Sequence, residues 1–135
     1  MLTDTDIADM LQAATDAVPH EMCGLLFRGK GFYRATNVAA NPEHDFEMTH
    51  AEFLSALKQC GEDPWAIVHS HPTKGAHGSV KDYRLMDALS IARVPLLMVI
   101  VGLNPKEIRI YEKHDRIYQM IYFQGAETLC APART

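Results

Sequence analysis

The chain has 135 residues, of which 47% are hydrophobic and 22% are charged. This length and composition are typical of one globular domain and are short for two. The formal net charge is −4 and the basic residues are scattered along the chain, which excludes the concentrated basic surface of a typical nucleic-acid-binding protein.

Three stretches carry apolar residues at helical spacing and are predicted to be helices. A proline ends the first stretch and a glycine ends the second. The residues that can cap these helices are Asp4 or Thr5, Thr49 and Ser79. The predicted helices cover residues 4–18, 49–60 and 79–91, with Leu54 and Ile91 expected on or near buried faces.

Apolar or alternating runs between turn residues predict strands. The predicted strands cover residues 22–27, 32–38, 46–48, 65–69, 95–101, 107–112 and 117–123. The many hairpins predict an α/β (α+β) fold, with a mixed, mostly antiparallel sheet flanked by helices. A single domain is expected at 1–123, followed by a C-terminal tail at 124–135 that has no pattern.

Two histidines, His69 and His71, follow the apolar run 65–68 at the end of a predicted strand, and their two-residue spacing points both side chains to the same side. Asp82 follows Ser79 by three residues, which places both on one face of a helix. Two imidazoles, one carboxylate and an open fourth position form the ligand set of a catalytic zinc site. The same donors would also bind iron or manganese.

The pattern His-Ser-His-x7-Ser-x2-Asp, from His69 to Asp82, resembles the signature of the JAMM (MPN+) metallopeptidases. Glu21 resembles the upstream glutamate of that family, because it opens the run Glu-Met-Cys-Gly-Leu-Leu. The resemblance covers roughly residues 5–123 and implies an MPN/JAB-like (cytidine-deaminase-like) fold. It also implies one Zn²⁺ per chain, held by His69, His71 and Asp82 with water in the fourth position.

The resemblance assigns roles to the other motif residues. Glu21 is implied to be the general base, which takes a proton from water and passes it to the leaving amine. Ser79 has two compatible roles, as a helix cap and as an oxyanion-stabilising donor. His77, in the glycine-containing loop at 72–78, is a candidate for contacting the substrate in a gate over the site. Cys23 fits a small buried hydrophobic residue better than a nucleophile.

The implied reaction is hydrolysis of a peptide or isopeptide bond, typically after the C-terminal glycine of a ubiquitin-like protein whose tail enters the site extended. A phage tail-assembly peptidase that processes a tail protein is an alternative, because residues 37–46 and 68–72 resemble such proteins. A non-catalytic MPN scaffold is the alternative from another class, since fold alone does not imply activity. A Ser-His-Asp hydrolase and a zinc deaminase are disfavoured, because the Gly-x-Ser-x-Gly and Pro-Cys-x-x-Cys motifs are absent.

The cysteines and the N-terminus indicate a cytoplasmic protein. Cys23, Cys60 and Cys130 cannot all pair, and none lies in a Cys-x-x-Cys unit, which indicates a reducing compartment. The acidic N-terminus is not typical of a signal peptide, and the longest apolar run, 94–101, is too short to span a bilayer. Neither nucleic acid nor a membrane is expected as a partner.

Overall fold

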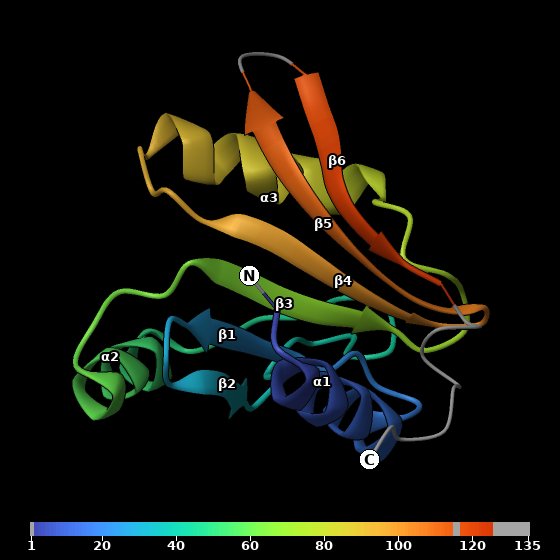
Figure 1. The fold of residues 1–135 in the computed structure, drawn as a ribbon, viewed down its shortest axis with the longest axis horizontal. Helices are drawn as coiled ribbons and strands as arrows, with labels where there is room; N and C mark the ends of the chain where they lie inside the picture. Colours follow the sequence, from blue (N-terminus) through green and yellow to red (C-terminus); the bar gives the residue numbers. More distant parts are fainter. Residues whose placement is uncertain (1, 115–116, 126–135) are drawn as a thin grey trace.

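A six-stranded sheet in the order β2-β1-β3-β4-β5-β6 organises the fold (Figure 1). The computed structural model describes residues 2–114 and 117–125. The strands are β1 (Cys23–Phe27), β2 (Gly31–Ala35), β3 (Ala66–His71), β4 (Leu97–Leu103), β5 (Lys106–His114) and β6 (Ile117–Gln124). Only β3 and β4 run parallel among these neighbours, and the other pairs are antiparallel. The predicted mixed, mostly antiparallel sheet flanked by helices is therefore confirmed.

Helix α1 (Asp4–Ala17) covers one face of the sheet. Its N-cap is Thr3, not Asp4 or Thr5 as predicted, because Thr3 and Asp6 form a reciprocal capping box. Met10 and Ala14 are fully buried against the central strands. The helix therefore packs against the face of β3 opposite the one that carries the two predicted histidine ligands.

Helices α2 (His50–Cys60) and α3 (Val80–Ile91) lie on the opposite face. In Figure 1, α3 crosses behind β5. Ala56 of α2 and Met86 of α3 are the buried apolar contacts of these helices with the sheet. The prediction that Leu54 and Ile91 lie on buried faces is wrong, because they are 50% and 83% exposed, and Ile91 is the last residue of its helix.

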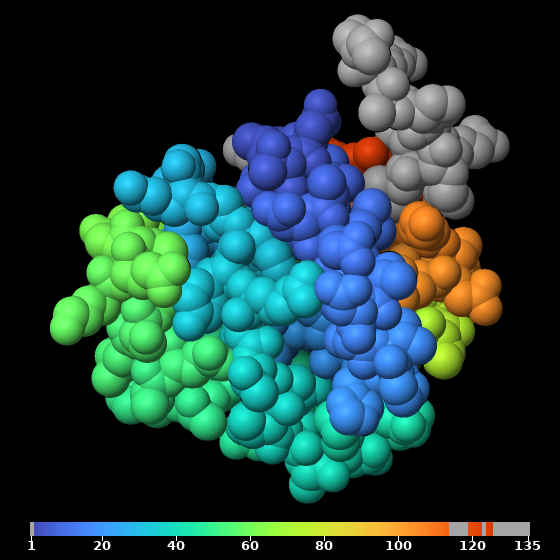
Figure 2. Space-filling view, turned by 90° about the horizontal axis from the view of Figure 1, so that it is seen from below, coloured from blue at the N-terminus to red at the C-terminus, as the bar shows by residue number. Residues whose placement is uncertain are grey.

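The segment between β2 and α2 is irregular. The prediction of a strand at 46–48 is wrong, because these residues have no regular structure. Strand β2 ends at Ala35 and does not continue to residue 38. The side chain of Asn37 supplies hydrogen bonds that a ladder would otherwise make, because its amide donates to the Asp45 carbonyl and its oxygen accepts from the Glu47 N–H. Together with α1, β2 and α2, this segment forms the face seen in Figure 2.

Two cysteines, Cys23 and Cys60, are free thiols, whereas Cys130 lies outside the described residues. Within the described part of the chain, no helix is long and apolar enough to cross a membrane. Strand β6 takes in Gln124, so it ends one residue later than predicted. Most of the predicted tail, from residue 126, lies outside the described residues.

Candidate metal centre

Strand β3 presents His69 and His71 on the face that also carries α3. The strand lies between β1 and β4, in the interior of the sheet. His69 is fully buried and His71 is 2% exposed. The residue between them, Ser70, points to the other face, where its hydroxyl oxygen accepts a hydrogen bond from the Met22 N–H at 2.7 Å.

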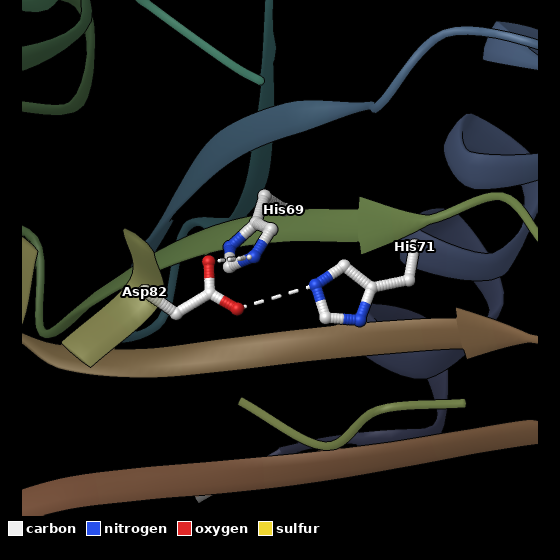
Figure 3. A group of neighbouring side chains, drawn as sticks. All are labelled: His69, His71 and Asp82. Atoms are coloured by element: carbon white, nitrogen blue, oxygen red, sulfur yellow. Dashed lines mark ion pairs between the residues drawn. The ribbon is translucent and has the colours of Figure 1, made fainter. Parts of the chain in front are cut away.

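Asp82 enters from the first turn of α3, and its two carboxylate oxygens point toward the two imidazoles (Figure 3). Its Oδ1 is 2.9 Å from His69 Nε2, and its Oδ2 is 3.2 Å from His71 Nε2. One ligand atom from each residue lies within 4.8 Å of the others, and all three residues are buried. The fold therefore brings together the three residues that the sequence predicted as metal ligands.

Burial and mutual contact determine the charge state of this group. Burial alone would raise the pKa of Asp82, but the contacts with His69 and His71 hold it well below its ordinary value. Burial lowers the pKa of His69, and the neighbouring carboxylate opposes this only in part. The cluster thus combines an ionised carboxylate with a neutral imidazole, which are the protonation states of metal ligands.

The donor set fits a metal ion. Neither ring nitrogen of His69 has a hydrogen bond of acceptable geometry within the described part of the chain, although Nε2 is close to Asp82. Buried polar atoms normally have partners, so an imidazole left in this condition calls for a cation. Imidazole nitrogen and carboxylate oxygen together suit zinc, and also iron or manganese.

Ser79 caps α3, as predicted. Its Oγ accepts from the Asp82 N–H at 3.2 Å, and its own N–H donates to Asp82 Oδ2 at 2.8 Å. The hydroxyl accepts in this cap, so its own proton remains available for donation to another group. One residue can therefore orient the third ligand and still act as a donor.

Glu21 lies two residues before the start of β1 and is 7% exposed. It lines a cavity of about 290 Å³ together with His71, Ser79 and residues of the two adjoining loops. Burial raises the pKa of Glu21 to about 7, and the charges of His71 and Asp82 act in opposite directions on it. A carboxyl group with this pKa can both accept and release a proton near neutral pH.

The structure does not bring His77 to this cavity, whose lining it does not join, and its side chain is exposed. Its proposed contact with a substrate stays a prediction. Cys23 is fully buried, and burial raises the pKa of its thiol to about 12, with further contributions from Glu52 and Glu21. The thiol is therefore protonated at neutral pH, as expected for a core residue.

Two residues near the site were not identified from the sequence. Phe46 stacks on the His69 ring, with centroids 4.5 Å apart and an angle of 16° between the planes. Asn37 donates a hydrogen bond to the Glu21 carbonyl at 2.9 Å and so anchors the backbone of the proposed base. The sequence predicted Asn37 within the strand 32–38, and an asparagine near a strand end does not specify which backbone groups it will contact.

Comparisons with known proteins agree with this site. The model of the family described as prokaryotic homologs of the JAB domain matches residues 5–113, a range that includes every motif residue from Glu21 to Asp82. Among solved structures, the chain is similar to the solution structure of protein DSY2949 from Desulfitobacterium hafniense. The two share 28% sequence identity with a TM-score of 0.67, over 87% of this chain and 86% of that one. No curated protein matches the chain.

Proposed function

Because the chain belongs to the family of prokaryotic JAB-domain homologs, we propose that it is a zinc-dependent peptidase or isopeptidase. The observation that carries the proposal is the buried convergence of His69, His71 and Asp82 beside the carboxyl group of Glu21. A purely structural metal site would have four protein ligands and no cavity. Here, among the described residues, three could act as ligands, and the adjoining cavity has room for a reacting group.

His69, His71 and Asp82 would hold the metal ion. A zinc ion bound there would supply Lewis acidity, which acidifies water and polarises a substrate carbonyl. Asp82 contributes the negative charge of the ligand set, and the Ser79 N–H keeps its carboxylate oriented. The burial of both imidazoles excludes bulk water from the ligand side of the site.

Glu21 would move the proton. In the first step, the water oxygen bonds to the amide carbon while Glu21 takes one proton from that water. In the second step, the carbon–nitrogen bond breaks and Glu21 returns the proton to the departing nitrogen, so the products are a carboxylic acid and an amine. The Ser79 hydroxyl would donate to the carbonyl oxygen as negative charge develops on it.

The substrate would be a protein with an extended tail, for which a ubiquitin-like C-terminus ending in glycine is the leading candidate. A cavity of about 290 Å³ admits a few small residues but no folded domain. Strand β2 is one edge of the sheet, and its Ala35 pairs with Cys23, two residues after Glu21. An extended peptide could add to this edge and lead its scissile bond toward the site.

The test is cleavage of a panel of ubiquitin-like proteins that are fused through their C-terminal glycine to a reporter. The zinc-loaded wild type should release the reporter, and Glu21→Gln should bind zinc equally and release none. Equal release by the Glu21→Gln protein would remove Glu21 from the mechanism. Wild-type and Glu21→Gln proteins that both capture the fusions without cleaving them would favour the scaffold alternative. A zinc-binding enzyme inactive on this panel would next be tested on phage tail proteins.

A further inference from the structure

Three residues lie side by side across the sheet next to the metal centre. His71 of β3 pairs with Gly102 of β4, and Gly102 pairs with Glu107 of β5. Directly paired residues share a face of the sheet, so the side chains of His71 and Glu107 flank a position that has no side chain. Glu107 is a charged residue with only 6% exposure.

The peptide group between Gly75 and Ala76 fills the space above Gly102. A Cβ on Gly102 would lie 2.4 Å from the Gly75 carbonyl carbon and 2.5 Å from the Ala76 nitrogen. A Cβ on Gly75 would lie 2.6 Å from Glu107 Oε2. Both glycines are therefore needed for the peptide group to reach its position between the histidine and the glutamate.

This one peptide group makes a hydrogen bond at each end. Its N–H, from Ala76, donates to Glu107 Oε2 at 2.7 Å, and its carbonyl, from Gly75, lies 2.8 Å from His71 Nδ1. A carbonyl oxygen can only accept, so Nδ1 carries a proton. The other nitrogen, Nε2, is then the one that faces Asp82 with its lone pair available to a metal ion.

We propose that Glu107 is a positioning residue that acts on His71 through the Gly75–Ala76 peptide group. A carboxylate bound to the N–H end polarises the peptide group and makes its carbonyl a stronger acceptor. The stronger acceptor fixes the tautomer and the ring orientation of His71 and makes Nε2 a better donor to the metal. Carboxylates that bind a ligating histidine directly have this effect on metal sites, and here one peptide group is interposed. The inference rests on the proposed metal site.

If Glu107 only held the loop that contains Gly75 and Ala76 in place, a second residue that holds this loop should have the same effect on His71. Tyr111 is such a residue, and it does not contact the Gly75–Ala76 peptide group. The Tyr111 hydroxyl donates to the Ala76 carbonyl at 3.1 Å and accepts from the Gly78 N–H at 3.3 Å. Tyr111→Phe therefore loosens the loop but leaves the Glu107–peptide–His71 chain intact. Glu107→Gln instead keeps the loop fastened, because the amide oxygen can still accept from the Ala76 N–H. It removes the negative charge that polarises the peptide group.

The experiment compares the wild type, Glu107→Gln and Tyr111→Phe by two readouts. The first is the NMR signal of the His71 Nδ1–H proton, measured in metal-free and zinc-loaded protein. The second is zinc affinity, measured by competition with a chelator. We expect Glu107→Gln to move the Nδ1–H signal upfield and to weaken zinc binding about tenfold, at the low end for outer-shell partners. Tyr111→Phe should leave the signal in place and change the affinity less than about twofold.

An unchanged Nδ1–H signal in Glu107→Gln, or equal losses of affinity in the two variants, would overturn the inference. If the wild type bound no zinc, the proposed function would fail, but the signal in metal-free protein would still decide whether Glu107 acts on His71. If Glu107→Gln did not fold, the test would use the wild-type protein alone. NMR scalar couplings across the two hydrogen bonds would then be measured. Absence of coupling from His71 Nδ1 to the Gly75 carbonyl carbon, or from the Ala76 nitrogen to the Glu107 carboxyl carbon, would contradict the proposed chain.

Discussion

Ser79 and Asp82 hydrogen-bond to each other in both directions. The Asp82 N–H donates to Ser79 Oγ, and the Ser79 N–H donates to Asp82 Oδ2. This capping box starts α3 and also orients the carboxylate toward His69 and His71. Helix initiation and ligand orientation are therefore one structural feature.

Ser79→Ala should lower the free energy of unfolding by about 1 kcal/mol, because the Asp82 N–H loses its acceptor. Ser79→Thr keeps a hydroxyl at the cap and should stay within about 0.5 kcal/mol of the wild type. Urea denaturation of the metal-free proteins measures both. Equal stability of the alanine and threonine variants would show that the cap contributes little.

Asp82→Asn should fold and should bind zinc more than about tenfold more weakly than the wild type. The amide oxygen of asparagine can still accept from the Ser79 N–H, whereas the negative charge in the ligand set is lost. Equilibrium dialysis against zinc, with circular dichroism as the folding control, measures the effect. Unchanged zinc retention would remove Asp82 from the ligand set.

Glu21 should make the metal-free protein less stable as the pH rises. Burial raises its pKa to about 7 in the folded protein from an ordinary value of 4.5, so the folded state holds the proton more tightly than the unfolded state. Between pH 4.5 and 7 the folded state binds more protons, and the contribution of Glu21 to the free energy of unfolding falls with pH. The destabilisation caused by ionised Glu21 is complete above pH 7 and absent below pH 4.5.

Glu21→Gln removes this titration. The free energy of unfolding of the variant, relative to that of the wild type, should therefore rise by on the order of 1 to 2 kcal/mol from pH 5 to pH 8. Chemical denaturation of both proteins in the presence of a chelator gives the difference. A constant difference between the two pH values would mean that Glu21 titrates normally in the folded protein.

Ser70→Ala should cost about 1 to 3 kcal/mol of stability, because it leaves the buried Met22 N–H without its acceptor. The hydrogen bond joins β3 to the chain next to Glu21, so local exchange of the Met22 amide should also speed up. Ser90→Ala, at an exposed position of α3, is the matched control and should be close to neutral. Similar stabilities of the two variants would contradict the importance of this buried bond.

Much of the site could be predicted from local spacing. Alternation along a strand places His69 and His71 on one side, and a three-residue step places Ser79 and Asp82 on one turn of a helix. These relations depend only on the geometry of single elements. The structure adds that α3 packs where Asp82 reaches both imidazoles, which the motif resemblance implied and local spacing alone could not give.

The contacts that the sequence did not reveal join distant segments. Glu107 reads as an ordinary charged residue of a strand, and its role depends on the alignment of β3, β4 and β5 through Gly102. The alternation of apolar and polar residues at 46–48 predicts a strand, but the hydrogen bonds of Asn37 hold that segment in an irregular form. Side-chain hydrogen bonds of this kind override local preference and leave no periodic signal.

The most direct test of the metal centre is a zinc titration of the metal-free wild-type protein against a competing chromogenic chelator. The structure predicts saturation at one zinc per chain through the single group formed by His69, His71 and Asp82 in the described residues. Saturable binding at that stoichiometry, weakened by Asp82→Asn, would support a metallohydrolase. A wild-type protein that binds no zinc, or one that binds it equally well after Asp82→Asn, would contradict the account.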